Sequence, residues 1–474
     1  MDCFDEMFGY DAEPPPRAPY HGYQRWFEGQ DSERLWAISR DAEASFRRTG
    51  ITFNVYGDDS ADERLIPFDV VPRILSAAEW SRLERGIEQR VRAINAFLHD
   101  IYHRREILRA GRIPVELIAE NIAFLPEMIG VAPPGGIYTH IVGVDLVRTS
   151  EDDFTVLEDN ARTPSGVSYM LENRETMLHL FPELFSSIRV RRIADYPQAL
   201  RRSLAACAPP ECASSTPTVA VLTPGMLNSA YFEHSFLADQ MGCELVEASD
   251  LLVIDGRLTM RTTHGHEPVD VLYRRVDDDF LDPLNFRQDS ALGAAGLFDI
   301  YRAGRLTIAN APGTGIADDK AIYSYMPEIV RFYTGEEPIL KNVETWRCSE
   351  PDSLSYVLDN LAELVVKEVH GSGGYGMLVG PAASTAELDD FAAKLRSKPD
   401  NYIAQPTLAL STVPILADSG LAPRHVDLRP FVLVSPRTIE ITPGGLTRVA
   451  LNDGSLVVNS SQGGGTKDTW VLAE

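Results

Sequence analysis

Long apolar runs are missing from this sequence of 474 residues, and cysteines are few. No stretch approaches the ~20 consecutive apolar residues that a helix needs to span a bilayer. The five cysteines are an odd number and none belongs to a CxxC pair, which argues against a disulfide framework and against a cysteine-based zinc site. We therefore expect a reduced, cytoplasmic globular protein of roughly two to four domains.

Positive charge is also scarce. Lysine and arginine together number 44 against 69 acidic residues, which gives a formal net charge of −25. Such a surface repels nucleic acid and anionic membranes, so neither is an expected partner. Only six of the basic residues are lysines, and none precedes Lys320. A phosphate site must then be a local island of positive charge, for which a lysine supplies a compact charge.

The residue pattern divides the chain into four segments. Residues 1–75 hold an irregular arm (1–30), a helix (32–48) and strand-like stretches, and residues 76–215 open with a long amphipathic helix that is followed by two strands. After a linker at 208–218, residues 216–315 alternate strands with helices, which is typical of a parallel, doubly wound sheet. The last segment is residues 316–474, in which strands dominate from about residue 345 onward. The pattern as a whole predicts a mixed α/β protein.

A glycine-rich loop, GSGGYG (371–376), follows Lys367. It matches G-x-G-x-x-G, but strand-like sequence lies on both sides, whereas a dinucleotide-binding loop leads into a helix. A protein kinase places its lysine after the loop, and the chain has no GxxxxGK[ST] sequence. The functional interpretation that remains is a hairpin whose backbone amides approach a phosphate, with Lys367 on the preceding strand. The structural alternative is a plain β-turn.

Three oxygen-bearing side chains lie on the two predicted strands of the second segment. Asp145 and Glu158 occupy adjacent strands, and Asn160 shares a face with Glu158 while Asp159 points to the opposite face. Such oxygens suit Mg²⁺, which binds one or two carboxylates together with substrate phosphates. In the turn that follows, backbone N–H groups near Ser165–Gly166 can hold an oxyanion. The alternative is a solvated acidic edge.

Taken together, these motifs resemble those of the ATP-grasp ligases. EDNARTPSG (158–166) is similar to the family's Glu-x-Asn-x-x-x-Pro-Gly, with one inserted serine, and it follows Asp145 at the family's spacing. VVKEVHGSGGYGM resembles the family's phosphate-binding strand and loop, and DLRPFV (427–432) resembles its Asp-(Ile/Leu)-Arg-x-Phe-Val strand. In ordinary members the lysines precede Glu-x-Asn, but here they follow it. This order resembles that of the circularly permuted ATP-grasp type 2 family.

The resemblance implies a circularly permuted ATP-grasp core in an α/β (α+β) fold, with residues 216–315 as the domain that precedes the core in the family. It implies Mg²⁺ at Asp145, Glu158 and Asn160. The residues it implies for ATP are Lys320, Lys367, Gly371, Ser372, Gly373, Gly374, Tyr375, Gly376 and the hinge residue Gln405. The catalytic candidates are Arg429, Arg448, Ser165, Gly166 and Asn459.

The implied activity is ATP- and Mg²⁺-dependent amide formation between a carboxylate and an amine through an acyl phosphate. An amino acid, a peptide or a related small acid is the implied substrate, and peptide-processing proteins are the implied partners. Two other functions stay open: a nucleotide-binding scaffold or regulatory protein without catalysis, and a phosphotransferase that stops after phosphorylation. One departure concerns the substrate, because ligases that join two alanines carry an arginine where this chain has Gly143.

Overall fold

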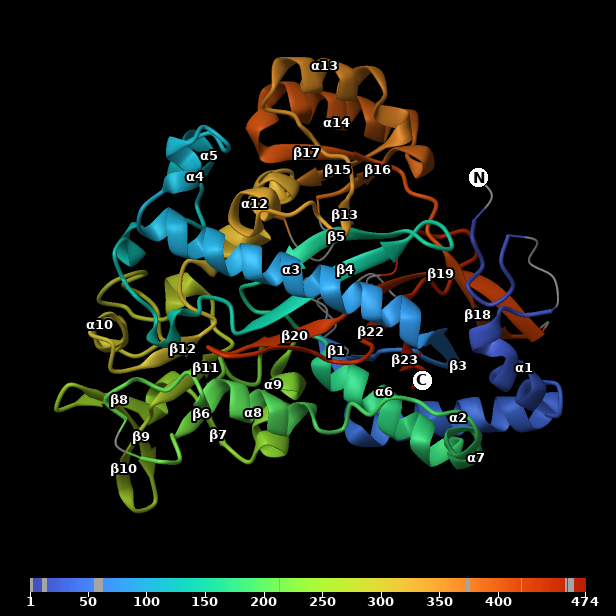
Figure 1. The fold of residues 1–474 in the computed structure, drawn as a ribbon, viewed down its shortest axis with the longest axis horizontal. Coiled ribbons are helices and arrows are strands. Elements are labelled where there is room, and N and C mark those ends of the chain that lie inside the picture. The colour runs from blue at the N-terminus through green and yellow to red at the C-terminus, as the bar shows by residue number, and fades with distance from the viewer. Residues whose placement is uncertain are drawn as a thin grey trace.

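A large mixed sheet forms the centre of the molecule in this computed structural model (Figure 1). Its strands are β3 (Phe68–Leu75), β4 (Ile141–Arg148), β5 (Phe154–Asn160), β13 (Lys341–Asn342), β18 (Thr412–Ala417), β19 (Gly420–Arg429), β20 (Phe431–Val434), β21 (Ile439–Ile441), β22 (Leu446–Val449) and β23 (Gly465–Val471). The main path runs β13-β5-β4-β19-β22-β23-β3, with β20 beside β4 and β18 beside β19. The structure describes residues 3–10, 15–54, 63–212, 214–371, 376–418, 420–456, 458 and 464–474.

The long helix expected from Ser76 is α3 (Ala77–Tyr102), and it crosses the sheet (Figure 1). Ser76 caps it: the Ser76 hydroxyl accepts from the Glu79 amide, while the Glu79 carboxylate accepts from the Ser76 amide. The apolar face of α3 packs on the even-numbered residues Val142, Val144 and Leu146 of β4. The odd-numbered residues of β4 therefore face the opposite side, where the candidate site lies.

A second sheet is parallel, as the alternation of strands and helices predicted. Its order is β12-β11-β6-β7, and its strands are β6 (Val219–Leu222), β7 (Glu244–Val246), β11 (Val271–Arg274) and β12 (Thr307–Ala309). Val219 and Val221 of β6 pack with α8 (Tyr196–Ala205) and α9 (Tyr231–Met241). Ala220 and Leu222 pack on the other face with α10 (Leu297–Arg302). Helices thus cover both faces of this sheet.

Three further sheets complete the strand content of the described residues. An antiparallel sheet of order β14-β17-β15-β16 carries α13 (Pro351–Asp359) and α14 (Thr385–Ser397) above the main sheet (Figure 1). Its strands are β14 (Trp346–Arg347), β15 (Leu364–Glu368), β16 (Leu378–Val379) and β17 (Tyr402–Pro406). A separate hairpin sheet, which the sequence pattern did not predict, holds β8 (Leu251–Ile254), β9 (Arg257–Thr262) and β10 (Gly265–Pro268). A short pair joins β1 (Thr52–Asn54) to β2 (Glu63–Leu65).

The N-terminal segment is more ordered than expected. Residues 1–30 were predicted to be irregular, but they contain helix α1 (His21–Phe27), and Phe4, Met7 and Tyr23 are buried. Burial of these apolar side chains stabilises a helix that is too short to show a clear periodicity in the sequence. The remaining α-helices of the described residues are α2 (Ser32–Thr49), α4 (Glu106–Arg109), α5 (Glu116–Ala119), α6 (Val167–Leu180), α7 (Pro182–Ser187), α11 (Lys320–Tyr323) and α12 (Met326–Thr334).

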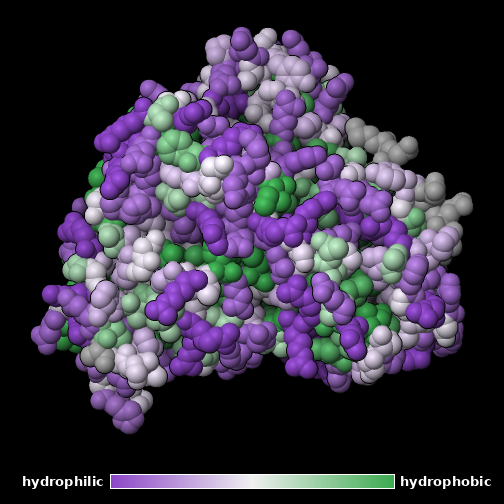
Figure 2. Space-filling model, in the orientation of Figure 1, coloured by the Kyte–Doolittle hydropathy of each residue, from purple (hydrophilic) through white to green (hydrophobic). Residues whose placement is uncertain are grey.

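The surface agrees with the acidic, polar composition. Seen from one side it is mostly hydrophilic, and the hydrophobic residues that remain visible lie mainly in its hollows (Figure 2). Within the described ranges, no helix is both long and apolar enough to cross a bilayer.

Candidate functional site

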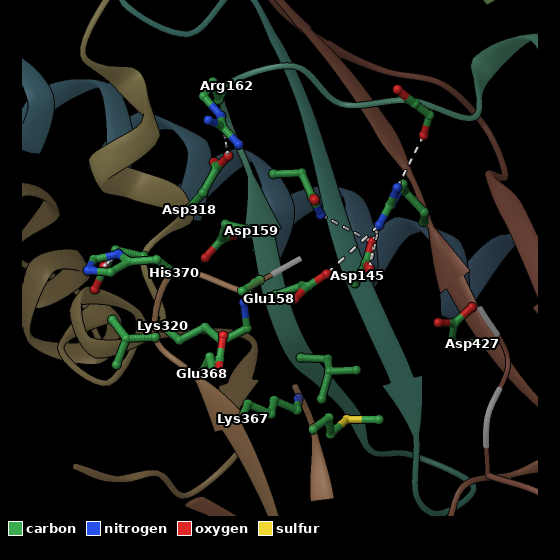
Figure 3. Close-up of a pocket in the computed structure, with 18 of the residues that line it drawn as sticks. Asp145, Glu158, Asp159, Arg162, Asp318, Lys320, Lys367, Glu368, His370 and Asp427 are labelled. Atoms are coloured by element: carbon green, nitrogen blue, oxygen red, sulfur yellow. Dashed lines mark hydrogen bonds and ion pairs between the residues drawn. The ribbon is translucent and has the colours of Figure 1, made fainter. Parts of the chain in front are cut away.

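A cavity of about 700 Å³ lies between the main sheet, the antiparallel sheet above it and the loops of the parallel domain. Lys367 of β15 and Lys320 of α11 lie on one side of it, and Asp145 of β4 and Asp427 of β19 lie on the other, with Glu158 between them (Figure 3). The volume is typical of sites for small molecules. The two halves of the motif set, far apart in the sequence, therefore meet in one cavity.

The register of β4 and β5 brings the predicted oxygen ligands together. Asp145 lies opposite Glu158, and Asn160 lies opposite Gly143. The amide nitrogen of Asn160 is 3.4 Å from Oδ1 of Asp145. Asp159 points away, as predicted, and its carboxylate accepts two 2.6 Å hydrogen bonds from Arg90 of α3. The pairing of β4 with β5 thus places three oxygen-bearing side chains on the cavity side.

Both predicted arginines bind the Asp145 carboxylate. Arg429 donates to Asp145 Oδ2 over 2.7 Å and Arg448 donates to the same oxygen over 2.8 Å. Arg448 also pairs with Asp427, its register partner on the neighbouring strand. Burial alone would raise the pKa of Asp145, but the two guanidinium groups outweigh it and hold this pKa below its usual range. Asp145 is therefore ionised and lies within a compact cluster of charges.

The absence of a side chain at Gly143 lets Arg429 reach Asp145. A Cβ atom built on Gly143 would lie 3.2 Å from Cδ of Arg429 and 3.3 Å from Cβ of Pro164. The stem of Arg429 therefore passes directly over the glycine. An arginine is absent at position 143 of this chain, but one from the adjacent strand β19 occupies the space above it.

The lysines lie on the nucleotide side. Nζ of Lys367 donates to Oε1 of Gln405 on β17 over 2.8 Å, and Nε2 of Gln405 donates to the Thr345 hydroxyl over 3.0 Å. Lys320 donates to the carbonyl oxygen of Gly371 over 2.5 Å. Burial lowers the pKa of Lys367 to about 8, although Glu158 acts in the opposite direction. Apolar side chains line the cavity near Gln405: Val343, Val365, Met377, Val379, Leu408 and Leu410.

The glycine-rich loop connects two antiparallel strands, β15 and β16, as predicted. Gly371 and Gly376 are described, and Gly376 has a φ of +68° that favours glycine. Ser372, Gly373, Gly374 and Tyr375 lie outside the described residues, and so does Asn459. Their assigned roles stay predictions.

The turn after Asn160 differs from the expectation. Gly166 has a φ of +114°, and its amide, which we expected to hold an oxyanion, donates to Oε2 of Glu233 over 2.7 Å. The carbonyl oxygen of Ser165 accepts from Arg429 over 3.2 Å. A carboxylate from α9 thus already binds this amide, because the parallel domain packs against the turn. Ser165 and Gly166 both line the cavity.

Several residues of the cavity were not identified from the sequence. Arg162 is 3.2 Å from Asp277 and 3.9 Å from Asp318, and all three line the cavity. Burial raises the pKa of Asp318 to about 7. Single acids in an acid-rich chain give no local signal. Arg275 does not line the cavity, but it gives a clearer signal as a basic residue just beyond a strand of the parallel sheet, where ligands of α/β proteins often bind.

The donor set fits a magnesium–nucleotide complex better than a free metal ion. In the part of the chain that the structure describes, no three His, Cys, Asp or Glu side chains form a group that could hold a metal. Two carboxylates and one amide beside a lysine-lined cavity match the habit of Mg²⁺, which shares its coordination with substrate phosphates. The residues present therefore fit the group that the motifs imply.

Comparison with known proteins supports the same assignment. A family model described as circularly permuted ATP-grasp type 2 matches residues 72–450. The chain belongs to this family. The predicted order of motifs and the permuted ATP-grasp fold are thus confirmed.

Relatives extend over nearly the whole chain. An uncharacterised protein of Synechocystis is 52% identical over 99% of this chain and 97% of its own length. An uncharacterised protein of Mycobacterium tuberculosis is also 52% identical, over 99% of this chain and 84% of its own. A Frankia casuarinae protein named "Putative glutamate--cysteine ligase 2-2" is 42% identical over 99% of this chain, but the match covers 53% of that protein.

A solved structure shares the fold. The glutathione synthetase-like effector of Globodera pallida, in its apo form, aligns with a TM-score of 0.60 over 94% of this chain and 98% of its own. The identity is 11%, so this likeness concerns the architecture alone.

Proposed function

We propose that the protein is an ATP- and Mg²⁺-dependent ligase that joins a carboxylate to an amine through an acyl phosphate. The observation that carries the proposal is one cavity with lysines at one end and the Asp145–Arg429–Arg448 cluster at the other. Phosphoryl transfer requires mainly positioning and neutralisation of charge, and this arrangement provides both.

The position of each residue in the cavity indicates its proposed role. Lys320 and Lys367 would bind the phosphates of ATP, and Gln405 would contact the base beside the apolar part of the cavity. When bound at Asp145, Glu158 and Asn160, Mg²⁺ would neutralise charge on the phosphates. Arg429 and Arg448 lie beside this set and would stabilise the γ-phosphoryl group as it moves to a carboxylate oxygen of the substrate.

The second half of the reaction would be attack by an amine on the acyl phosphate. The carbonyl carbon forms a bond to nitrogen, the bond to the phosphate oxygen breaks, inorganic phosphate leaves, and the amine nitrogen loses one proton. An acyl phosphate hydrolyses in water, so the site must be covered. The glycine-rich loop between β15 and β16, in the sheet above the cavity, would provide that cover.

The relatives support the class of reaction. The name of the Frankia protein describes a ligase that joins a carboxylate to an amine, although this chain matches only about half of that protein. An amino acid, a peptide or a related small acid is the proposed substrate. We further propose that the protein acts in the cytoplasm beside peptide-processing partners.

The nucleotide products test the proposal. Purified protein would be incubated with Mg²⁺-ATP and a protein-free metabolite extract, and phosphorus NMR would identify the products. We expect ADP and inorganic phosphate, with no product from Lys367→Ala and normal product from Lys341→Ala, which removes an exposed lysine paired with Asp153. AMP and pyrophosphate would contradict acyl-phosphate chemistry. No turnover with intact ATP binding would favour a nucleotide-binding scaffold or regulatory protein.

A further inference from the structure

We propose that Arg275 and Glu233, which belong to the parallel domain, are positioning residues for Arg429. They act through Ser165, the serine inserted between the proline and the glycine of the Glu-x-Asn motif. We call this chain of hydrogen bonds the relay. Its effect on catalysis rests on the proposed ligase function, whereas its contacts do not depend on that function. Neither residue lines the cavity, so they would not touch a substrate.

Arg275 follows β11, the strand of the parallel sheet that ends at Arg274, and it is 6% exposed. One terminal nitrogen donates to the carbonyl oxygen of Pro164 over 2.8 Å. The other donates to the Ser165 hydroxyl over 2.6 Å and to Oε1 of Glu233 over 3.2 Å. The planar fork of the guanidinium thus binds two consecutive residues of the turn at once.

Glu233 completes the grip on the same turn. Its Oε2 accepts from the amides of Gly166 and Ser168, over 2.7 and 3.1 Å, at the N-terminus of α6. The side chain is 1% exposed, and its charge is compensated by Arg275 and by the positive end of the helix. A buried ion pair that also satisfies backbone amides holds its partners in a narrow range of positions.

The same turn also binds Arg429. The carbonyl oxygen of Ser165 accepts from one terminal nitrogen of Arg429 over 3.2 Å, and the other donates to Asp145 over 2.7 Å. Ser165 therefore lies between two arginines, with its hydroxyl on Arg275 and its carbonyl on Arg429. This gives the inserted serine a function: it links the parallel domain to the charge cluster.

Arg274 is a buried arginine of the same domain that does not contact this turn. It is fully buried one residue earlier, but it donates to the carbonyl oxygens of Asn310, Val276 and Ala311 and pairs with Asp278. All of these partners belong to residues 276–311. Arg274 and Arg275 are thus a matched pair, of which only Arg275 donates directly to the motif.

A double-mutant cycle tests the relay without any ligand. Arg275→Lys keeps the charge beside Glu233, but an ammonium cannot reproduce the fork. We expect the loss of melting temperature in Arg275→Lys combined with Arg429→Lys to differ from the sum of the single losses by about 2 °C or more, because contacts in one network couple. Arg274→Lys combined with Arg429→Lys should be additive. Additivity in both cycles would overturn the inference.

Kinetics test the consequence for the reaction. In the ADP-release assay, we expect Arg275→Lys and Ser165→Ala to lower kcat about tenfold or more while KM for ATP changes less than about threefold, since misplacement of a catalytic group affects the transition state. Arg274→Lys should leave both unchanged. A uniform loss in all three variants would overturn a positioning role. If the wild type releases no ADP, the ligase proposal fails, and the cycle still decides the relay.

Discussion

Raising the pH should weaken ATP binding well below the ordinary pKa of lysine. Burial lowers the pKa of Lys367 to about 8. Only the protonated form attracts phosphate, and with this pKa the protonated fraction falls from about 0.76 at pH 7.5 to about 0.09 at pH 9. The apparent affinity scales with this fraction, so Kd for Mg²⁺-ATP should increase about eightfold. A lysine of ordinary pKa would change the affinity by only about 4% over this range.

Calorimetric titration across this pH range measures the effect. The γ-phosphate is already ionised above pH 7.5, because its pKa is near 6, so it does not contribute. Repeating the titrations in buffers of different ionisation enthalpy should show uptake of protons on binding near pH 8. Lys367→Arg stays charged at every pH tested and should bind with an affinity that does not change with pH. Constant wild-type affinity between pH 7.5 and 9 would refute the role given to Lys367.

Three further predictions follow from the site and the core. Gly143→Ala places a Cβ 3.2 Å from Arg429; we expect ADP release to fall about tenfold with the melting temperature nearly unchanged, and full activity would show that the position of Arg429 is unimportant. Glu158→Gln should keep Mg²⁺-ATP affinity within about threefold but lower turnover about 100-fold, and undiminished Mg²⁺-dependent turnover would refute the metal assignment. Glu6→Ala leaves Arg73 buried without its carboxylate; denaturant unfolding should show a loss of about 3–5 kcal/mol, and a loss below about 1 kcal/mol would contradict this.

The sequence carried enough information to predict the elements that present the site. The 3.6-residue periodicity after Ser76 predicted α3, and its capping box confirmed where the helix begins. Alternation from Glu158 to Asn160 predicted that these two side chains share a face and that Asp159 points to the opposite face, where it binds Arg90. Such predictions succeed because the face of a strand or helix is a local property.

Contacts between distant segments could not be predicted in this way. Arg429 and Asp145 are 284 positions apart, and Glu233 and Gly166 are 67 apart. Tertiary packing determines which strands and domains become neighbours, and a local sequence pattern carries no information about it. For the same reason the sequence suggested a free amide at Gly166, whereas Glu233 binds it.

The hairpin sheet and the N-terminal arm show a second limit. The apolar run of β8 looked like a strand of the parallel sheet, but it lies at the edge of a separate sheet with Leu252, Val253 and Ile254 exposed. The arm is rich in proline and glycine, yet Phe4 and Glu6 are buried against the main sheet, and Ser411 donates to Glu6 over 2.6 Å. Composition predicted neither outcome, because tertiary packing decided both: β8 pairs with β9 instead of joining the parallel sheet, and the arm is buried against the main sheet.

Trapping with hydroxylamine tests the central claim most directly. The protein would be incubated with Mg²⁺-ATP, hydroxylamine and a protein-free metabolite extract, and new hydroxamates would be sought by mass spectrometry, with Lys367→Ala as the control. An ATP-dependent hydroxamate that forms with the wild type and not with Lys367→Ala is the predicted result, and its mass would identify the acid. Release of ADP without any hydroxamate would contradict activation of a carboxylate.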